Sequence, residues 1–368
     1  MRKIGISIYP KFLDEKTWKI YIDKSLNLGY SRVFISLLEV SGQGGPLLER
    51  LKTIANYAKS KNMEVYVDIA PKILKLIGIE LDDYATNAEE VINFFNTYGA
   101  TAMRMDGDFG GKTEAMLSNN KQNFKVELNA SSTTHLIDRV MSFGADRHLI
   151  TACHNFYPQT QTGLSLPFFI ESSNQFYNAG VAVAGFVRSH VGKLGPWAIN
   201  DGLCTLEMHR NLPLKTQAKH MFMFNAVDDI IIGDAMASDE ELNDLANVLK
   251  TKLAFAVNIS KTASTLENTI LFKEGHFVRG DMNDSFLRST LSRVKYKGEK
   301  FQQVKYDGSI KKGDVLIGND SFGNYKGELQ IALKDMPNDN RKNKIASIKE
   351  HEIFLLDYIQ PWQHFSFE

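Results

Sequence analysis

Cysteine is scarce in this sequence. Among 368 residues only Cys153 and Cys204 are present, and they lie too far apart to form a metal knuckle or a redox pair. We therefore expect both to be buried packing residues. A signal peptide and a membrane helix are also lacking at the start of the sequence, because Ser7 interrupts the first apolar run and Pro10 ends it. These absences predict a protein of the reducing cytoplasm.

An excess of charge of either sign is missing. The sequence has 43 Lys and Arg residues against 43 Asp and Glu residues, so no net field would draw it to nucleic acid or to an anionic membrane. We expect a small molecule as the partner, with no nucleic acid and no membrane. An anionic substrate would need a local group of cations. No feature of the sequence indicates an oligomeric state.

The common cofactor motifs are missing as well. No G-x-G-x-x-G follows the first predicted strand, no H-E-x-x-H occurs, and the glycine-rich residues 42–45 lack the Lys and Ser/Thr of a P-loop. We therefore expect neither a cofactor nor a metal. Residues 42–45 are expected to form a substrate loop or, alternatively, to bind an anion with their amides. Glu39 precedes this loop and is expected either to bind substrate, to hold the loop or to be solvated.

Eight short segments rich in β-branched residues are present between residue 4 and about residue 233, and amphipathic segments separate them. Such alternation predicts parallel strands joined by crossover helices. The predicted strands are residues 4–9, 32–37, 64–69, 102–106, 125–129, 149–153, 182–188 and 229–233. This number and spacing predict a (β/α)8 TIM barrel, an α/β fold, and an open doubly wound sheet is the alternative.

The segments between these strands carry apolar residues at intervals of three and four, as helices packed on a sheet do. The predicted helices are residues 13–28, 47–61, 87–98, 134–143, 166–177 and 214–225. Gly29, Gly99 and Gly144 are expected to end three of them, because glycine adopts the left-handed backbone conformation that often follows a helix. Residues 72–84 predict a weak short helix, and residues 110–122 a glycine-started loop followed by a short helix.

The pattern changes after a predicted helix at residues 239–252. Short apolar runs at residues 275–279, 304–306, 315–318, 328–333 and 353–359 are separated by Asp-Gly, Lys-Gly and Pro-Asn turns. They predict a small antiparallel β domain, and the polar residues 334–344 predict a mobile loop. We therefore expect a barrel domain of residues 1–250 and a β-rich domain of residues 251–368.

Every predicted strand of the barrel ends in polar residues, although the strand interiors are nearly all apolar. Function in this fold collects at the carboxyl ends of the strands. The residues expected there are Ser7, Glu39, Asp68, Arg104, Asp106, Asn129, His154, Asn155, Tyr157, Arg188, His190 and Asp234. A purely structural barrel would not need such a collection.

The segment of residues 194–210 is long for a connection between a strand and a helix, which usually indicates a functional loop. It contains Trp197, which either stacks on a sugar ring or packs against the barrel rim. It ends with Glu207, His209 and Arg210, which we add to the candidate site residues.

Structural roles are the alternative for several of these residues. Asp68 or Asp106 would serve as a helix N-cap in a loop after a strand. Lys125 and Glu127 would pair inside the barrel as a structural ion pair. His154 would be a core histidine, although the following Asn and Tyr favour a binding role.

Many carboxylates around a barrel mouth suit two reaction classes. Glycoside cleavage uses one protonated carboxyl near the leaving oxygen and, usually, a second carboxylate. Metal-assisted hydrolysis needs a set of His and Asp ligands, which only His154, His209 and Asp106 would supply if the fold brought them together. The missing metal motifs favour the first class.

Eight short motifs then give the sequence a resemblance to a known family. They are G-I-S-I-Y-P at 5–10, V-D-I-A-P at 67–71, R-M-D at 104–106, L-N-A-S at 128–131, C-H-N-F-Y-P at 153–158, T-G-L at 162–164, T-L-E-M-H-R at 205–210 and I-I-G-D at 231–234. With these motifs in this order, the chain resembles the bacterial 6-phospho-N-acetylmuramidases. The resemblance implies a TIM barrel followed by a small antiparallel β-barrel domain of the cyclophilin-like kind.

The resemblance also implies a function. A member of this family would cleave 6-phospho-N-acetylmuramic acid from N-acetylglucosamine in a disaccharide that a phosphotransferase system imports, and would thus act in peptidoglycan recycling in the cytoplasm. Among the carboxyls we rank Asp106 first, Glu207 second and Asp68 third, followed by Glu39 and Asp234. A substrate-assisted mechanism that uses the 2-acetamido group is an alternative.

A doubly anionic sugar needs fixed cations in a protein without net charge. Arg104, Arg188, His190 and Arg210 are the candidates for this role, with Arg188 first because phosphate often binds near the seventh and eighth strands of this fold. The other functions that the residues leave open are a sugar-phosphate aldolase or isomerase and a non-catalytic carbohydrate-binding barrel. The first usually needs a Schiff-base lysine or a metal, and no strand end offers such a lysine.

Overall fold

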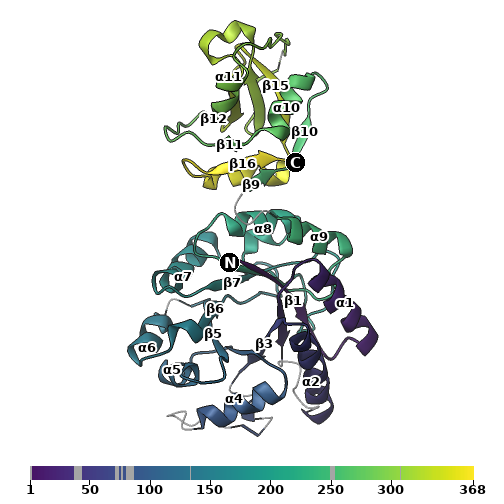
Figure 1. Ribbon diagram of the computed structural model, residues 1–368, viewed down its shortest axis with the longest axis vertical. Coiled ribbons are helices and arrows are strands. Elements are labelled where there is room, and N and C mark those ends of the chain that lie inside the picture. Colours follow the sequence, from purple (N-terminus) through teal and green to yellow (C-terminus); the bar gives the residue numbers. More distant parts are fainter. Residues whose placement is uncertain are drawn as a thin grey trace. The chain divides into compact units, whose positions relative to one another are not determined.

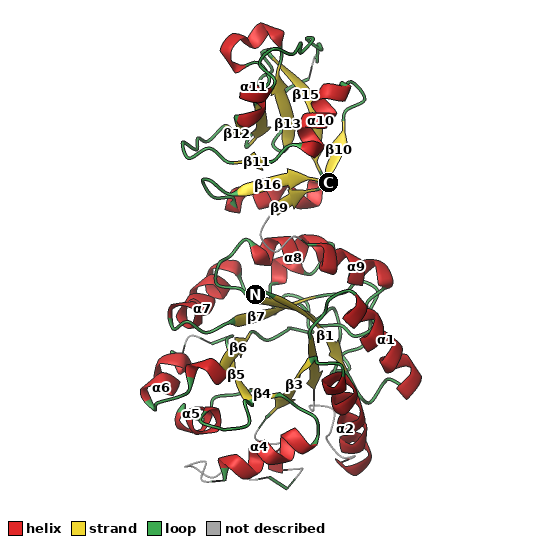
Figure 2. Cartoon of the chain, viewed as in Figure 1, coloured by secondary structure: helices red, strands yellow, loops and turns green. Residues whose placement is uncertain are grey.

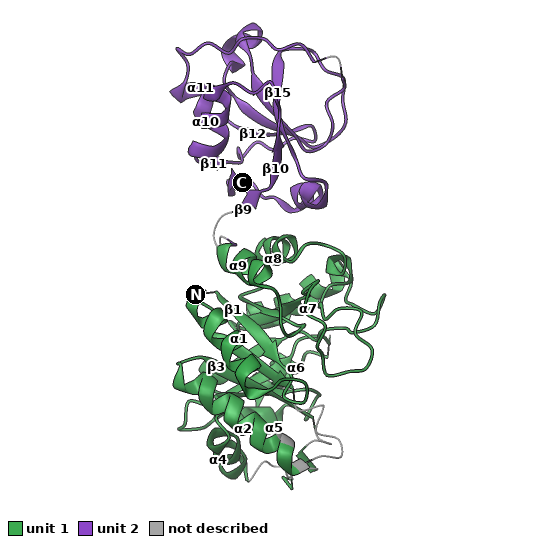
Figure 3. Cartoon of the chain, turned by 90° about the vertical axis from the view of Figure 1, so that its right-hand side faces the viewer, with its two compact units in different colours: residues 1–247 green, residues 248–368 purple. Residues whose placement is uncertain are grey.

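The chain folds into two compact units, Met1–Asn247 and Val248–Glu368, which Figure 3 shows in different colours. The structure, a computed structural model, describes residues 2–36, 44–70, 74–75, 78–79, 87–132, 134–248, 253–306 and 308–368.

Eight parallel strands close into a barrel in the first unit (Figure 1). They are β1 (Lys3–Ile8), β2 (Arg32–Ser36), β3 (Glu64–Ile69), β4 (Ala102–Met105), β5 (Lys125–Asn129), β6 (Ile150–Cys153), β7 (Val183–Val187) and β8 (Asp229–Ile232). The last strand pairs with the first, with Ile4 opposite Ile230, and this pairing closes the barrel. The predicted TIM barrel is therefore confirmed, and the open doubly wound sheet is excluded.

Helices surround this barrel (Figure 2). Those described are α1 (Glu15–Asn27), α2 (Gly44–Ser60), α4 (Ala88–Thr97), α5 (Lys112–Ser118), α6 (Leu136–Ser142), α7 (Leu166–Asn178), α8 (Leu214–Phe222) and α9 (Asp239–Asn247). Gly29, Gly99 and Gly144 follow three of them with φ of 87°, 89° and 77°, as predicted. Gly99 is required for space as well, because an added Cβ would lie 2.6 Å from the backbone nitrogen of Asn56. The helix predicted within residues 72–84 lies largely outside the described residues.

The second unit contains two separate sheets. The larger one has the order β10 (Val257–Ile259), β15 (Lys342–Ile348), β13 (Asp314–Gly318), β14 (Leu329–Ala332) and β12 (Phe286–Ser289), and the smaller one β11 (His276–Phe277), β16 (His364–Phe367) and β9 (Leu253–Phe255). All described pairings are antiparallel except that of β16 with β9. The expected antiparallel character is thus confirmed, whereas the described strands do not show closure into a small barrel.

Three expectations for this unit are wrong. Residues 353–359 were expected to form a strand, but Glu350–Tyr358 is a 3-10 helix, and its buried residues Glu352, Leu355 and Leu356 follow helical spacing. Residues 304–306 form no strand, because side-chain amides bind their backbone: Val304 N donates to Asn343 Oδ1, and Asn338 Nδ2 donates to Tyr306 O.

The third, a mobile loop at residues 334–344, is wrong only at its end, because residues 334–341 belong to no named strand or helix. The central strand β15 begins inside this stretch, at Lys342, and the Asn343 amide is buried and donates to Glu267 Oε1. The helix α10 (Thr265–Lys273) was not predicted at all, although Ser264 and Glu267 form a capping box at its start, which is a signal readable in the sequence. Polar residues inside the strands of this unit thus interrupt the apolar pattern from which strands are predicted.

Candidate active site

A small open pocket lies at the carboxyl ends of the barrel strands. Its volume is about 150 Å³, and its lining residues are Asp68, Arg104, Asp106, Asn155, Phe156 and Trp197. Asp68 and Arg104 stand directly opposite each other on β3 and β4, and the others follow β4, β6 and β7. Side chains at such positions share one face because strand residues alternate in direction.

Arg104 connects the polar groups of this pocket. Its Nη1 atom donates to Asp68 Oδ1 at 2.6 Å and to Asp106 Oδ1 at 3.2 Å, and its Nη2 atom donates to Asn155 Oδ1. The arginine side chain is only 4% exposed. Its guanidinium group is therefore fixed by three acceptors and holds all three in place.

The two aspartates share this partner but differ in environment. Asp68 is buried, and burial raises the pKa of its carboxyl to about 7, with Asp106 adding to the rise and Arg104 opposing it. The Asp106 side chain is 30% exposed. Asp68 can therefore hold a proton near neutral pH in the same pocket where a second carboxyl meets solvent.

The shared nitrogen also limits the separation of the two carboxyls. The bound oxygens lie 2.6 Å and 3.2 Å from Nη1, so the distance between them cannot exceed these two lengths together, about 5.8 Å. Neither aspartate is a helix N-cap, because Asp68 lies inside β3 and Gly111 is the N-cap of the helix after Asp106. The N-cap alternative is therefore wrong for both.

Behind the pocket, Ser131 and His154 hold Asn155. The Asn155 backbone N donates to Ser131 Oγ at 2.7 Å, and His154 places Nδ1 3.4 Å from that oxygen and Nε2 2.9 Å from Ser173 Oγ. Burial and the nearby Arg104 lower the pKa of His154 to about 3. His154 is thus a neutral, fully buried residue that does not line the pocket, as the structural alternative predicted.

Tyr157 and Asn129 belong to the same group of residues. Burial raises the pKa of Tyr157, and its hydrogen bonds to Ser131 and Asn155 act against this rise. Asn129 Oδ1 accepts from Ser131 N at 2.9 Å. Ser131 was not among the predicted site residues, although its motif was noted, and it joins several of them.

Glu207 and Arg210 form a separate clamp. Arg210 donates to both Glu207 oxygens, from Nε at 2.7 Å and from Nη2 at 2.6 Å, while the backbone nitrogens of Gln161 and Gly163 donate to the same carboxylate. Chiefly because of the Arg210 hydrogen bonds, the pKa of Glu207 falls to about 2. Arg210 Nη1 also donates to Gly202 O at 2.8 Å. Glu207 thus ties loops together and is not among the residues that line the pocket.

The residues at the ends of β7 and β8 also hold backbone. Arg188 Nη1 donates to the carbonyls of Asp201 and Arg210, both at 2.9 Å. Asp234 Oδ2 accepts from the backbone nitrogens of Ser189 and Leu203, and burial raises the pKa of its carboxyl to about 6. The ring of His190 contacts Leu212 O at 2.8 Å. These contacts shape the loops after β7 and β8.

The remaining predicted residues lie apart from the pocket lining. His209 is buried and its Nε2 lies 2.8 Å from His220 Nδ1. The Oγ atom of Ser7 is buried and has no hydrogen-bond partner among the described residues. Glu39 lies outside the described residues. Within the described part of the chain, no three His, Cys, Asp or Glu side chains are grouped so that they could hold a metal ion.

Two aromatic residues complete the pocket wall. Trp197, predicted either to stack on a sugar or to pack at the rim, lines the pocket and is 49% exposed. Phe156 was not predicted, although it follows two predicted site residues, and its ring packs edge-on against Phe34 and Phe186. The pocket therefore combines an apolar wall with carboxyl, guanidinium and amide groups.

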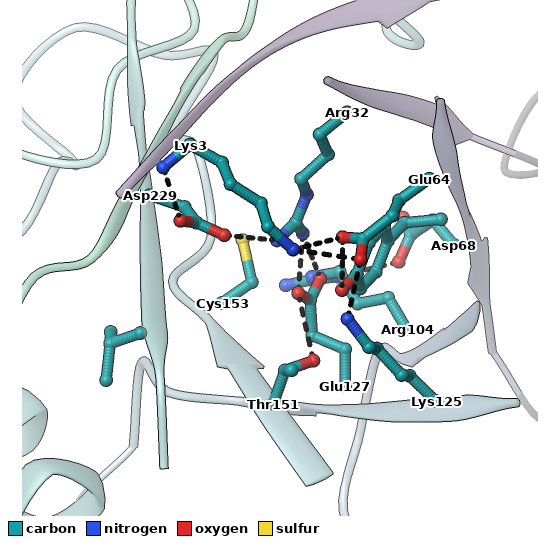
Figure 4. A network of polar contacts seen from close by, with 12 residues as sticks. Lys3, Arg32, Glu64, Asp68, Arg104, Lys125, Glu127, Thr151, Cys153 and Asp229 are labelled. Carbon is teal, nitrogen blue, oxygen red and sulfur yellow. Dashed lines mark hydrogen bonds and ion pairs between the residues drawn. The ribbon is translucent and has the colours of Figure 1, made fainter. Parts of the chain in front are cut away.

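Charged side chains continue into the barrel interior below the pocket (Figure 4). Arg32 Nη2 donates to the two Glu127 oxygens at 2.7 Å and 2.5 Å, and the Lys125 ammonium lies 2.7 Å from Glu64 Oε1. The predicted pair of Lys125 with Glu127 is therefore wrong. Lys125 lies opposite Ala102 and Glu127 opposite Arg104, so the two occupy different levels of the barrel and find different partners.

Comparison with known families covers nearly the whole chain. Residues 4–247 match the family model described as 6-phospho-N-acetylmuramidase, N-terminal, and residues 253–368 match the one described as 6-phospho-N-acetylmuramidase, C-terminal. The chain belongs to the 6-phospho-N-acetylmuramidase family. Membership in this family supports a glycoside hydrolase-like function. None of the curated proteins matches the chain.

Two solved structures resemble this family member along its full length. One is an uncharacterized B. cereus protein, with 42% sequence identity, a TM-score of 0.91, and coverage of 100% of this chain and 99% of that one. The other is a conserved Enterococcus faecalis protein with an unknown function, with 27% identity, a TM-score of 0.74, and coverage of 100% and 96%. In the described part of the chain, no helix is both long and apolar enough to cross a membrane.

Proposed function

We propose that this protein is a glycoside hydrolase that releases 6-phospho-N-acetylmuramic acid from N-acetylglucosamine. Two observations support the proposal: the family models match both units, and the pocket presents two carboxyls in different environments on one arginine. The second observation carries the chemistry, because glycosidases need one protonated and one ionised carboxyl at the scissile bond.

Asp68 is the proposed proton donor. Its buried carboxyl keeps a proton near neutral pH and can pass it to the leaving oxygen. Asp106, which solvent reaches, is the proposed second carboxyl, which attacks the anomeric carbon or orients the 2-acetamido group for attack. Arg104 holds both carboxyls and stabilises the negative charge on Asp106.

The geometry favours retention of anomeric configuration. The two oxygens that bind Arg104 are at most about 5.8 Å apart. This upper limit allows the roughly 5–5.5 Å of retaining enzymes and lies below the roughly 6.5–9.5 Å of inverting ones. A substrate-assisted reaction also retains configuration. Proton NMR of the first product formed, recorded before mutarotation, distinguishes retention from inversion.

The apolar wall is the proposed platform for a sugar ring. Phe156 and Trp197 line the pocket beside the carboxyls, and aromatic faces pack well against sugar rings. Of the two arginines first expected to bind phosphate, Arg210 is buried and bound to Glu207, whereas Arg188 is half-buried. Arg188 Nη2 has no hydrogen bond among the described residues, so Arg188 is the proposed phosphate contact.

Several accompanying proposals follow from the same substrate. A phosphorylated disaccharide formed on import is met in the cytoplasm, which places the enzyme there and in peptidoglycan recycling. We further propose a cyclophilin-like closed form for the second unit.

Hydrolysis is expected to need neither a metal nor a nucleotide, and full activity after exhaustive chelation would bear this out. An aldolase reaction through a Schiff base gains no support, because none of the pocket-lining residues is a lysine.

The direct test is to incubate the purified full chain with the phosphorylated disaccharide and to follow both sugars by mass spectrometry. Release of both products by the wild type, and its loss in Asp106→Asn, is the expected result. An intact disaccharide after prolonged incubation with the folded wild type would contradict the proposal.

A further inference from the structure

The barrel interior contains a group of charged side chains beside an apolar cluster. Barrels of this fold are usually filled by layers of branched apolar side chains. Here the apolar part consists of Phe34, Cys153, Ala184, Phe186 and Ile231, which pack together. The charged part takes side chains from β1 to β5 and from β8, and Figure 4 shows them converging.

The pair of Arg32 and Glu127 is the most deeply buried part of this charged group. Their side chains are 1% and 0% exposed. The Tyr66 ring covers the guanidinium group, with its centroid 3.6 Å from Cζ, and Gly5 leaves room for Arg32, because an added Cβ would lie 3.1 Å from that of Arg32. A buried ion pair contributes little to stability once desolvation is counted. Stability alone therefore does not explain the presence of this ion pair.

Glu127 lies next to the arginine of the pocket. It stands opposite Arg104 in the register of β4 and β5, so the two side chains point to the same side. Arg104 thus has Glu127 as a neighbour in addition to Asp68 and Asp106, which share its Nη1. Two arginines face the three carboxyls of Asp68, Asp106 and Glu127. Asp229, 3.6 Å from Arg32, also has Lys3 as a charged neighbour.

This imbalance has a chemical consequence. Two guanidinium groups cannot fully neutralise these three carboxylates, so the most buried carboxyl without a cation of its own keeps a proton. Both oxygens of Glu127 accept hydrogen bonds from Arg32. Asp68 and Asp106 are then left to share Arg104.

We propose that Glu127, held by Arg32, is a positioning residue that leaves a single arginine for Asp68 and Asp106 and thereby keeps Asp68 protonated. The inference rests on the proposed function of this pocket. It is a role inside the barrel, because Glu127 is not among the residues that line the pocket.

The proposal concerns the titration of Asp68, whose charged and titratable neighbours come from several strands. Among the described residues, Arg104 and Asp106 on and after β4 and Glu127 on β5 act on Asp68 directly. Around them, Arg32 on β2, Tyr66 on β3, Cys153 on β6 and Asp229 on β8 act on one another or on Arg104. The carboxylate of Glu127 is among the causes that raise the pKa of Asp68, behind burial and the contacts with Arg104 and Asp106. Its removal should therefore make Asp68 a stronger acid.

The test is a 13C NMR titration of the Asp68 carboxyl in the full-length protein without substrate, with the signal assigned by its loss in Asp68→Asn. In Glu127→Gln the midpoint should fall by about one pH unit, as expected for the loss of one nearby buried charge. Glu127→Asp keeps the charge and should restore most of the wild-type midpoint. An unchanged midpoint in Glu127→Gln would overturn the proposal.

A matched control is Glu64→Gln. Glu64 lies on the same strand as Asp68, but Lys3 and Lys125 both bind it, so its loss should move the midpoint by no more than a few tenths of a pH unit. If Glu127→Gln does not fold, Arg32→Gln provides the opposite change: Glu127 then turns to Arg104, and the Asp68 midpoint should rise. A fall there would overturn the proposal. The titration needs no turnover. It therefore tests the role of Glu127 even if the disaccharide is not the substrate.

Discussion

Asp68 and Asp106 share a single nitrogen atom, Nη1 of Arg104, at 2.6 Å and 3.2 Å. This arrangement places a buried carboxyl and a solvent-accessible one on the same cation. Because both bind the same cation, the raised pKa of Asp68 arises chiefly from its burial.

Replacing Asp106 by Asn should abolish most of the turnover and leave the fold intact. The side chain is 30% exposed, so its charge contributes little to stability, whereas a positioned catalytic carboxylate is worth about 10²–10⁴ in rate. We expect kcat to fall by at least about 10² with Tm nearly unchanged. Asp108→Asn, which removes an exposed carboxylate bound to Arg139, is the control and should turn over normally. Near-normal kcat in Asp106→Asn would remove this residue from the mechanism.

The pH profile should report the proton on Asp68. A general acid works only when protonated, so kcat/KM should decline as the pH rises through about 7, the pKa of this carboxyl. In Asp68→Asn the remaining activity should be low and should lack this decline. A wild-type profile that stays flat from pH 6 to pH 8 would argue against Asp68 as the acid.

The same group links stability to pH in a definite direction. Its folded-state pKa of about 7 lies above the roughly 3.9 of an unfolded Asp. The unfolded chain therefore loses the proton first, and the stabilisation due to this group is complete below about pH 4 and is lost as the pH rises to about 7. Urea unfolding of wild type and Asp68→Asn across this range measures the difference, which should shrink with rising pH.

Glu207→Gln should lower the stability of the fold clearly and reduce kcat only modestly. The carboxylate receives two bonds from Arg210 and two from backbone nitrogens, and a hydrogen bond to a charged group contributes about 1.5–3 kcal/mol. We expect a loss of about 2 kcal/mol in the free energy of unfolding and a rise in KM, with kcat within about tenfold of wild type. A folded variant that loses several powers of ten in kcat with KM unchanged would instead make Glu207 catalytic, as its second rank in the sequence analysis implies.

Arg188→Met should lower discrimination for the 6-phosphate. Loss of one charge-assisted contact costs about 1.5–3 kcal/mol, which corresponds to about 10–100-fold in kcat/KM for the phosphorylated disaccharide. Because Arg188 also binds two loop carbonyls, cleavage of the plain disaccharide should fall as well, but by less. Arg210→Met is the comparison, because that guanidinium is bound to Glu207 and should affect both substrates alike. Equal cleavage of both disaccharides by the wild type would disprove phosphate recognition.

The barrel could be predicted from the sequence because its signals are local. Alternating β-branched and amphipathic segments located all eight strands to within about one residue, and Gly29 and Gly144 ended helices where expected. The second unit was harder. Its central strand β15 begins with Lys342 and Asn343, whose burial depends on partners far away in the sequence, and this hid the strand from a period-two pattern.

The candidate site was predicted in part. Asp68, Arg104, Asp106 and Asn155 end their strands and line one pocket. The polar residues at the other strand ends look equivalent in the sequence, yet Glu207, Arg210 and Asp234 bind backbone nitrogens or carbonyls, and which contact forms depends on how the loops fold. The pair of Arg32 and Glu127 was missed because the register of four strands, not any motif, brings it together.

The charged barrel interior also constrains how the chain can fold. Arg32 and Glu127 are 95 residues apart in sequence, on β2 and β5, so β3 and β4 have to take their places before the pair can be enclosed. A nascent chain that ends before β5 would expose Arg32 or bury it without its carboxylate, and the latter is strongly unfavourable. The first half of the barrel is thus expected to stay open until the fifth strand is available, so that the barrel closes cooperatively and not by stepwise addition of stable βα units.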